Sequence, residues 1–514
     1  MMIGKRALLF LFSLSVFLSC TSSGWAERLS RVRLLHFNDI YEITPQKELG
    51  GFAPLLTLIE QQRQQAVPSL LTFGGDLLSP SVLSYLTKGK EMITLCNIMG
   101  VDVAVLGNHE FDHGLETLHF RLGESRFPWL ASNLRAADGG LLPHSQEWVI
   151  RQVGDLQIAF IGLLTPATAD LATLGSQVRF LDPIPVAKEL LPLLKQQGVD
   201  LIIALTHLSL AEDEELARQV EGIDLILGGH DHDNMLRTIG NTHIVKAASD
   251  GAQLARIDLT LLRPDPGAKG KSRVLPEFHF LSTFRLPAHP EVQTVIEGIH
   301  QRLQQQLQRS AGVTEGELDS RESTVRERES SLANLFADAM RLESGADVTL
   351  LNGGSLRGNR LYAPGTVLSL GDIYKESPFG NTVVVMEMSE QAIWQALEHG
   401  LSQLGKGSGR FLQLSGLSIR YDPRQAVGER VLDVELWQGE RSEPLRRDGT
   451  RLLKVASNDY LARGGDGFRM LAESRVLIAA EAGQPLSTVV MNYLQKQGQS
   501  LVLPRAGRIQ VVGP

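Results

Sequence analysis

Acidic, amide and imidazole side chains follow five apolar runs in the first half of the chain. The segments that carry them are Asn38-Asp39, Gly74-Gly75-Asp76, Gly107-Asn108-His109-Glu110, Thr206-His207 and Gly228-Gly229-His230-Asp231-His232. Carboxylate, amide and imidazole donors together suit divalent ions such as zinc, manganese, iron or cobalt. The donors outnumber the needs of one tetrahedral ion, which favours two ions that share a bridging carboxylate.

The runs before these segments are typical of buried strands. They are continuously apolar rather than alternating, as in strands that are covered on both faces. The predicted strands are 32–37, 70–73, 101–106, 158–164, 201–205 and 223–227. Ligands bind at the carboxyl ends of strands in α/β sheets, which is where the polar segments stand. We therefore expect an α/β unit in which sheet layers are wrapped by helices.

Each segment alone is weak evidence, because a Gly-Gly-Asp is usually a turn and a histidine after a strand is usually structural. Five such endings in this order are harder to dismiss. Together they resemble the metallophosphoesterase signature, in the version found in bacterial 5′-nucleotidases and UDP-sugar hydrolases. The resemblance implies an N-terminal β-sandwich wrapped by helices and a smaller α/β C-terminal domain that binds nucleotides.

The resemblance also implies a role for each polar side chain. Asp76 would bridge two divalent ions, and the other ligands would be Asp39 and His232 on the first ion and Asn108, His207 and His230 on the second. His109 and Asp112 match the catalytic pair of the family. A metal-bound water would attack phosphorus, while His109 stabilises the transition state or protonates the leaving oxygen.

Tyr41 stands where the family commonly has a metal-binding histidine, because the pattern Asn-Asp-x-His is here Asn38-Asp39-Ile40-Tyr41. Tyrosine, with a pKa near ~10, is a poor ligand for most divalent ions. We therefore expect the first ion to lose a nitrogen donor, for which His232 compensates in part. His36, just upstream, is expected to support the site from behind the ligands.

Polar segments in the second half of the chain resemble the nucleotide-binding half of the same family. Taken singly they would be turns. The residues that match substrate contacts are Arg326, Asn352, Gly354, Arg357, Phe379, Asn381, Tyr460 and Asp466. The two arginines suit phosphate, because a guanidinium fork matches its geometry. Phe379 and Tyr460 match the pair that sandwiches the base, where stacking is worth ~1–3 kcal/mol.

Glu322 is a second departure from the family. An arginine often stands at this position, four residues before Arg326. The grip on phosphate is therefore expected to be weaker or differently tuned.

The length of 514 residues predicts more than one core. We expect a metallophosphoesterase domain at 29–288, a connecting helix at 289–310 and a substrate-binding domain at 311–514. The connector is polar and rich in glutamine, and the resemblance implies that the domains rotate about it. Further predicted elements are helices at 331–342 and 390–399 and strands at 348–351 and 383–387.

Residues 1–26 are typical of a secretion signal, because Lys5 and Arg6 precede a short apolar run. Cleavage before Cys20, which would leave a lipid-modified lipoprotein, and ordinary cleavage after Ala26 both fit the sequence. Either one predicts export to the periplasm. Cys96 would then be the one remaining cysteine, in an apolar stretch that predicts a buried thiol.

The net charge of −8 gives no electrostatic reason to expect a nucleic-acid polymer as partner. The expected partner is a small nucleotide, and a monomer is favoured. The leading hypothesis is hydrolysis of 5′-nucleotides to nucleosides and phosphate. The same site could instead act on nucleotide-sugar pyrophosphates, 2′,3′-cyclic phosphodiesters, 3′-nucleotides or sulfur esters. The third hypothesis is a nucleotide-binding protein that has lost catalysis. Tyr41 at the position of a metal ligand favours this hypothesis. The presence of Asp76, His109 and Asp112 argues against it.

Overall fold

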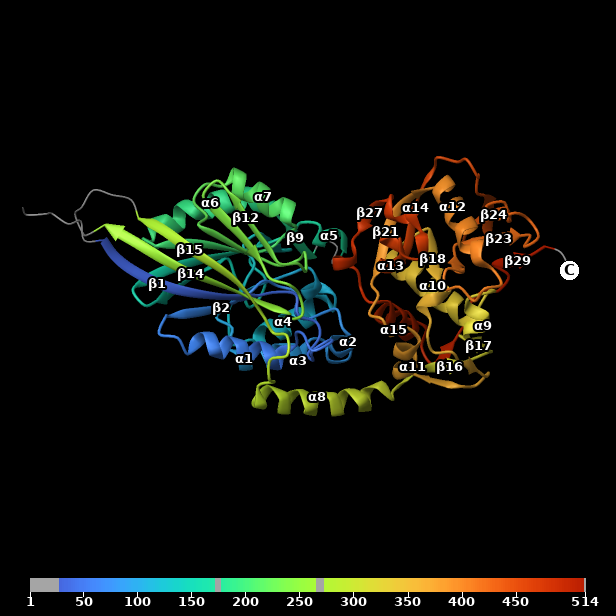
Figure 1. Ribbon diagram of the computed structural model, residues 1–514, viewed down its shortest axis with the longest axis horizontal. Helices are drawn as coiled ribbons and strands as arrows, with labels where there is room; N and C mark the ends of the chain where they lie inside the picture. The colour runs from blue at the N-terminus through green and yellow to red at the C-terminus, as the bar shows by residue number, and fades with distance from the viewer. Residues whose placement is uncertain (1–26, 172–176, 265–271, 513–514) are drawn as a thin grey trace, which may run out of the picture.

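The structure is a computed structural model. It describes residues 27–171, 177–264 and 272–512. The predicted secretion signal at 1–26 lies outside the described residues. An N-terminal unit (27–282) and a C-terminal unit (310–511) lie side by side, and helix α8 (Pro290–Leu307) runs along one side of both (Figure 1).

Two sheets make up the centre of the N-terminal unit. In spatial order, the larger sheet consists of β15 (Arg273–Ser282), β14 (Gln253–Pro264), β1 (Glu27–Phe37), β2 (Ser69–Phe73), β3 (Val103–Val105), β4 (Trp129–Leu130) and β6 (Ser145–Gln146). The smaller sheet consists of β12 (Met235–Ile239), β13 (Thr242–Lys246), β11 (Leu225–Gly228), β10 (Leu201–His207), β8 (Leu156–Leu164) and β7 (Trp148–Val153). β1, β2 and β3 pair in parallel, as do β8, β10 and β11. β5 (Leu134–Ala136) pairs with β9 (Val178–Phe180).

Apolar side chains of both sheets meet in one core, which includes Val32 and Val103 from the larger sheet and Phe160 and Leu205 from the smaller one. Helices cover the outer faces: α1 (Phe52–Arg63), α3 (Lys90–Met99) and α4 (Gly114–Glu124) on the larger sheet, and α6 (Pro183–Gln196) and α7 (Leu210–Gln219) on the smaller. This stack confirms the predicted sandwich wrapped by helices. The strand sequences are continuously apolar because one face of each sheet packs on the other sheet and the opposite face is covered by helices.

Two predicted strands are shorter or shifted. The strand expected at 101–106 pairs only over Val103–Val105, and the one expected at 223–227 is β11, Leu225–Gly228. The flanking residues Val101 and Leu106 are nevertheless buried. The apolar runs in the sequence therefore indicated which residues are buried, and they did not indicate where strand pairing begins or ends.

A five-stranded sheet forms the middle layer of the C-terminal unit. Its strands, in spatial order, are β22 (Leu412–Ser415), β18 (Val348–Asn352), β26 (Leu452–Asn458), β21 (Val383–Ser389) and β27 (Arg475–Ile478). One face packs on α10 (Ser331–Ser344) and α15 (Leu486–Gln497). The other face packs on α12 (Glu390–Gly400) and α14 (Arg469–Ala472), and on a sheet of β25 (Arg441–Pro444), β24 (Val431–Gln438), β23 (Leu417–Tyr421) and β29 (Ile509–Val511). The predicted α/β character of this part is confirmed.

Shorter elements complete the described chain: α2 (Val82–Thr87), α5 (Thr168–Leu171), α9 (Glu322–Val325), α11 (Leu370–Glu376), α13 (Asp459–Ala462), β16 (Ser310–Thr314) with β20 (Val367–Ser369) and β28 (Ser500–Leu501), and β17 (Leu318–Asp319) with β19 (Leu361–Tyr362).

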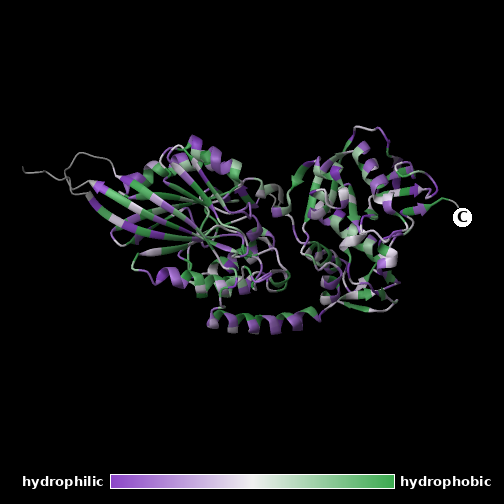
Figure 2. Ribbon diagram, in the orientation of Figure 1, coloured by the Kyte–Doolittle hydropathy of each residue, from purple (hydrophilic) through white to green (hydrophobic). Residues whose placement is uncertain are grey.

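Helix α8 occupies the position predicted for the connector and is largely hydrophilic (Figure 2). Val292, Ile296 and Ile299 are its buried side chains, and their spacing places them on one face. They pack into the core of the N-terminal unit. The start of α8 is therefore fixed to that unit, and only Gln308 and Arg309 separate its end from β16. Within the described ranges, no helix combines the length and apolarity needed to cross a bilayer.

Candidate functional site

Asp39, Asp76 and His207 form a fully buried cluster at the carboxyl ends of β1, β2 and β10. One ligand atom from each lies within 4.8 Å of the others. His207 Nε2 is 3.1 Å from Asp76 Oδ2 and 3.9 Å from Asp39 Oδ1. Burial alone would lower the pKa of His207, but the two carboxylates outweigh it and raise that pKa to about 9. Two buried carboxylates this close together need a positive charge beside them, which a protonated His207 or a bound cation can supply.

Four of the predicted ligands have left-handed backbone conformations. The φ angles are 50° at Asp39, 65° at Asp76, 82° at His230 and 62° at His232. Such conformations cost about 1–3 kcal/mol each outside glycine and concentrate at functional sites. Hydrogen bonds hold the loops in place: the backbone N–H of His230 donates to Asp39 Oδ2 (2.9 Å). The strained backbone at these four residues therefore belongs to the loops that bring the predicted ligands together.

Hydrogen bonds behind the cluster fix which atoms face it. Asn38 Nδ2 donates to Asp39 Oδ2 at 2.6 Å, which leaves Asp39 Oδ1 toward the cluster. His207 Nδ1 donates to the carbonyl oxygen of Gly74 at 2.8 Å, which leaves its Nε2 inward. His36 binds Thr72 Oγ1 and the carbonyl of Gly228, and burial lowers its pKa to about 4. The structure thus places His36 behind the ligands.

Buried atoms of three predicted ligands lack a hydrogen bond of good geometry among the described residues: Asn108 Oδ1, His230 Nδ1 and His207 Nε2, the last of which is only ion-paired with Asp76 Oδ2 at 3.1 Å. Buried polar atoms are almost always paired, so each orphan needs an explanation. The rings of His207 and His230 are 5.1 Å apart. These three residues are the non-bridging ligands predicted for the second ion, and a cation would satisfy all three atoms.

Tyr41 lies inside the cluster rather than beside it. Its hydroxyl oxygen is 3.1 Å from Asp39 Oδ1, 3.2 Å from Asp76 Oδ2 and 3.0 Å from His232 Nε2. Burial and the nearby carboxylates hold the pKa of Tyr41 well above its ordinary value. The side chain that replaces the family's histidine therefore contacts three of the predicted ligands.

His109 lies between Asp112 and the C-terminal unit. Its Nδ1 is 2.8 Å from Asp112 Oδ2, and its Nε2 is 3.0 Å from the carbonyl oxygen of Glu481. Burial alone would lower the pKa of His109, but Asp112 and Asp76 raise it to about 10. Both ring nitrogens face acceptors, as an imidazolium with two N–H donors requires. The backbone N–H of His109 also donates to Asp76 Oδ1 at 2.9 Å.

Glu110 has a supporting role that the sequence did not reveal. Its buried carboxylate accepts the backbone N–H groups of Asp76, Leu77, Leu78 and Gly107, at 2.9, 2.6, 3.1 and 2.5 Å. Burial and the nearby Asp76 carboxylate raise the pKa of Glu110 to about 7, although the backbone N–H groups of Leu77, Asp76 and Gly107 act to lower it. Its position directly after His109 was the available signal. Glu110 therefore ties the loop after β2 to the loop after β3.

We expect Glu110→Gln to lower the free energy of unfolding by about 1–3 kcal/mol or more, because an amide cannot accept all four N–H groups and brings donors of its own. Chemical denaturation of the two proteins measures the difference. Glu116→Gln is the matched control, since Glu116 lies exposed on α4. Equal stability of the Glu110 and Glu116 variants would contradict this role.

Lys246, at the end of β13, is a second buried support. Its Nζ donates to the carbonyls of Leu208 (2.6 Å) and Gly229 (3.0 Å) and pairs with Asp213 at 2.9 Å. The two carbonyls belong to the segments that carry His207 and His230. A lone lysine at the end of the apolar strand Thr242–Lys246 was the only signal in the sequence.

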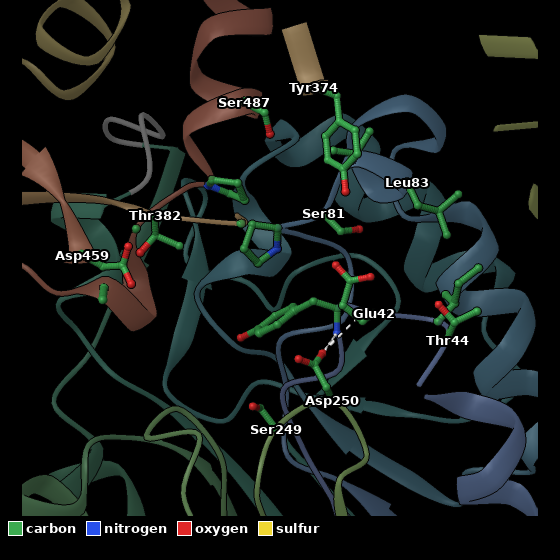
Figure 3. A pocket seen from close by; sticks show the side chains of 18 of the residues that line it. Glu42, Thr44, Ser81, Leu83, Ser249, Asp250, Tyr374, Thr382, Asp459 and Ser487 are labelled. Atoms are coloured by element: carbon green, nitrogen blue, oxygen red, sulfur yellow. Dashed lines mark hydrogen bonds between the residues drawn. The ribbon is translucent and has the colours of Figure 1, made fainter. Parts of the chain in front are cut away.

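A cavity of about 360 Å³ separates this cluster from the C-terminal unit (Figure 3). Tyr41, Ser81 and Asp250 line it from one side, and Thr382 and Asp459 from the other. Figure 3 shows the side chains of Ser81, Asp250, Thr382 and Asp459 around this space. The buried cluster is therefore reached from between the two units.

A second cavity, of about 490 Å³, lies within the C-terminal unit. All eight residues predicted to contact substrate line it, together with Ser355 and Gly409. Phe379 and Tyr460 are 56% and 45% exposed, which is unusual for aromatic side chains. The Arg357 guanidinium stacks on the Phe379 ring at 4.9 Å, and Tyr460 Oη is 2.9 Å from Asp466 Oδ1. An open slot with aromatic and cationic walls can hold a flat, anionic molecule.

Neighbouring residues of the same two segments line the two cavities. Phe379, Asn381 and Tyr460 line the second cavity, whereas Thr382 and Asp459 line the cavity beside the buried cluster. The cavities share no lining residue. A molecule held in the second cavity would therefore lie outside the cavity beside the cluster in this arrangement.

Comparison with known proteins identifies both units. Residues 32–234 match the family model of calcineurin-like phosphoesterases, and residues 310–473 match that of the 5′-nucleotidase C-terminal domain. A 5′-nucleotidase of Bos taurus is 27% identical over 94% of this chain and 92% of its own length. A trifunctional nucleotide phosphoesterase of Bacillus subtilis is also 27% identical, over 93% of this chain, which spans only 35% of that protein.

Solved structures with the same fold cover nearly the whole chain. A 5′-nucleotidase precursor of Thermus thermophilus is 27% identical, with a TM-score of 0.55 over 94% of this chain and all of its own. The NAD nucleotidase of Haemophilus influenzae is 20% identical, with a TM-score of 0.80 over 95% of this chain and all of its own. This second likeness concerns the fold alone.

Proposed function

Because the chain belongs to the family that joins a calcineurin-like phosphoesterase domain to a 5′-nucleotidase C-terminal domain, we propose that it hydrolyses 5′-nucleotides to nucleosides and phosphate. Members of this family are hydrolases of phosphate ester bonds, and the chain has a candidate metal site in Asp39, Asp76 and His207. The observation that carries the proposal is the pairing of this site with a cavity lined by all eight predicted substrate contacts.

The residues fit two divalent ions, in keeping with the orphaned atoms of Asn108, His207 and His230. Asp39, Asp76 and His232 would hold one ion, and Asp76, Asn108, His207 and His230 the other. Asp76 Oδ2 suits the shared position, since it lies 3.1 Å from His207 Nε2 and 3.2 Å from Tyr41 Oη, while Oδ1 accepts a backbone N–H. When bound, such ions activate a water as nucleophile and neutralise charge on the phosphoryl group.

His109 is the proposed general acid. Its Nε2–H projects toward the C-terminal unit, where a leaving oxygen would be presented, and Asp112 holds the ring from the opposite side. Asp112 also favours the protonated imidazole that this role requires. Donation of the Nε2 proton to the leaving oxygen then releases a neutral nucleoside.

The second cavity is the proposed nucleotide pocket. Phe379 and Tyr460 would stack on the base, and Arg326 and Arg357 would bind phosphate. Asn352 and Asp466 would hydrogen-bond the nucleoside. Arg326 Nε is buried and has no partner among the described residues, so it is available as a donor.

We expect Phe379→Ala to raise KM for AMP by about 5- to 100-fold, which corresponds to the ~1–3 kcal/mol of base stacking. KM for glycerol 2-phosphate, which has no ring to stack, should change little. Phe284→Ala is a matched control, because Phe284 is also half exposed and also carries an arginine, Arg285, at 4.9 Å. Equal effects on both substrates would contradict base stacking at Phe379.

One observation favours a second substrate class. Glu322 Oε1 lies 2.7 Å from Arg326 Nη1 and so neutralises part of the proposed phosphate subsite. In a phosphodiester or pyrophosphate, each phosphorus centre carries one negative charge. The Glu322 carboxylate would therefore weaken the binding of such a substrate less than the binding of a dianionic monoester. We expect Glu322→Gln to raise kcat/KM for AMP up to about 5-fold and to change that for 2′,3′-cyclic AMP less. No gain for AMP would remove the argument for the second class.

Parallel assays with AMP, UDP-glucose, 2′,3′-cyclic AMP and p-nitrophenyl phosphate test the proposed function, together with metal analysis of the same protein. Highest kcat/KM for AMP is the expected result. A preference for UDP-glucose or the cyclic nucleotide would move the substrate to the second class. Nucleotide binding without phosphate release by the metal-loaded protein would show a degraded enzyme.

Export to the periplasm is also proposed, on the charged and apolar residues Lys5 to Leu18 alone. Mass spectrometry of the mature N-terminus distinguishes the two cleavage sites. A diacylglyceryl group on Cys20 identifies a lipoprotein, and an N-terminus after Ala26 identifies ordinary cleavage.

A further inference from the structure

The hydroxyl of Tyr41 lies where a metal ligand would lie. Its separations from Asp39 Oδ1, Asp76 Oδ2 and His232 Nε2 are 3.1, 3.2 and 3.0 Å, and His232 Nε2 is 3.4 Å from Asp39 Oδ1. A regular tetrahedron with edges of about 3.2 Å has its centre about 2.0 Å from each corner, which is the length of a metal–oxygen or metal–nitrogen bond. Four of the six separations among these atoms are therefore close to the edge length that an ion bound by all four would require.

Hydrogen bonding accounts for this arrangement only in part. A phenol has one proton to donate, and its oxygen faces two carboxylate oxygens, from Asp39 and Asp76. His232 can donate to the phenol oxygen, but it cannot supply a proton to both carboxylates. One pair of oxygens at 3.1 or 3.2 Å is thus left without a proton between them. A cation at the centre would remove this repulsion.

Tyr41 is also held firmly in this position. The left-handed turn at Asp39 directs the next residues across the site. The backbone N–H groups of Tyr41 and Glu42 both donate to Asp250 Oδ1, at 2.9 and 3.0 Å, and Asp250 N–H donates to the carbonyl of Asp39 at 2.7 Å. The Tyr41 ring packs edge-on against His109 with ring centres 6.0 Å apart. The position of the hydroxyl is therefore built into the loop.

We propose that Tyr41 is a direct ligand of the first metal ion, through its phenolic oxygen, and that this site selects ferric iron over divalent ions. A tyrosine replaces a neutral imidazole with a hard, anionic oxygen donor. Together with Asp39 and Asp76 it makes a ligand set of three anionic oxygens and one nitrogen, which suits a hard ion of higher charge. The phenolic O–H bond breaks as the O–Fe bond forms, and the proton goes to solvent. Iron enters as ferric ion, so its oxidation state is unchanged.

This inference rests on the proposed two-ion site. A visible absorption spectrum distinguishes failure of the Tyr41 assignment from failure of the two-ion site. A phenolate bound to ferric iron gives a charge-transfer absorption in the visible range, whereas zinc gives none. The protein is stripped of metal, loaded with ferric iron and zinc, and analysed for bound ions and visible absorption. We expect one iron and one zinc per chain and a visible band. Tyr41→Phe, which keeps the ring, and Tyr41→His, which restores the family's ligand, should both lose the band.

Tyr374→Phe is the control, because Tyr374 lines the same cavity from the C-terminal unit. It should keep the band, and circular dichroism should show all three variants folded. Two bound ions without a band, or a band that survives in Tyr41→Phe, would overturn the role of Tyr41 and leave the two-ion site intact. Fewer than two ions in the wild-type protein, with AMP left unhydrolysed, would overturn both.

Discussion

Replacement of His109 by alanine is expected to lower kcat for AMP by about 10²- to 10⁴-fold, the usual contribution of a general acid. The His109 ring is paired with Asp112 and is directed toward the C-terminal unit, and neither ring nitrogen is among the orphaned atoms of the cluster. Its link to the cluster is the backbone N–H that donates to Asp76 Oδ1, which alanine retains. Bound metal should therefore stay unchanged.

The measurement is steady-state phosphate release combined with metal analysis of the same samples. His119→Ala is the control, because His119 lies on α4, outside both cavities. Asp112→Asn should cause a smaller loss, since it keeps the ring in place but removes the negative charge. Turnover by His109→Ala within a few-fold of wild type would contradict the assignment, and so would a loss of metal equal to the loss of turnover.

Locking the two units in the arrangement seen here is expected to abolish turnover of AMP. The proposed nucleotide pocket is separate from the cavity beside the metal-binding cluster, because the two cavities share no lining residue. The Nε2–H of His109 also donates a hydrogen bond to the carbonyl oxygen of Glu481, so this proton is not available to a leaving group. The C-terminal unit must therefore turn about the end of α8 before reaction.

The lock can be placed where the units touch without entering either site. Tyr85 on α2 contacts Gln495 on α15, with Tyr85 Oη 3.2 Å from Gln495 Oε1. Tyr85→Cys and Gln495→Cys, in a chain with Cys20→Ser, would be joined by a bifunctional thiol reagent with a reducible spacer. Cys96 is fully buried and its thiol pKa is raised by burial, so it should not react.

We expect AMP turnover to fall to background on cross-linking and to return when the spacer is reduced. Each single-cysteine variant, treated with the same reagent, should keep its activity. Full turnover in protein whose cross-link is confirmed by mass spectrometry would contradict a need for rotation.

The strand pattern predicted sheet layers wrapped by helices with polar segments at the strand ends, because both follow from general rules of α/β folds, and the resemblance added the sandwich. Parallel strands of one sheet end at the same edge, so Asp39 and Asp76 had to approach each other once β1 and β2 were recognised, whereas His207 ends a strand of the other sheet. The eight residues predicted to contact substrate came from resemblance rather than from pattern, since they stand at the ends of several elements and in the turns between them. No periodicity would have brought Arg326 and Tyr460 together.

Other features of the site depend on geometry that a sequence does not encode in a readable way. The place of the Tyr41 hydroxyl follows from the φ angle at Asp39, and the weak ligand expected at that position therefore lies inside the cluster. Glu110 acts through four backbone N–H groups, which every residue except proline possesses. The contact between His109 and the Glu481 carbonyl joins residues 372 positions apart, and a carbonyl has no sequence signature.

The central claim is that this chain hydrolyses 5′-nucleotides at a two-ion centre. Its most direct test is phosphate release from AMP by metal-stripped protein as metal is added back, with bound ions counted at each step. The account predicts no release from the stripped protein and a rate that reaches its plateau at two ions per chain. Release without bound metal, or a plateau at one ion per chain, would contradict it.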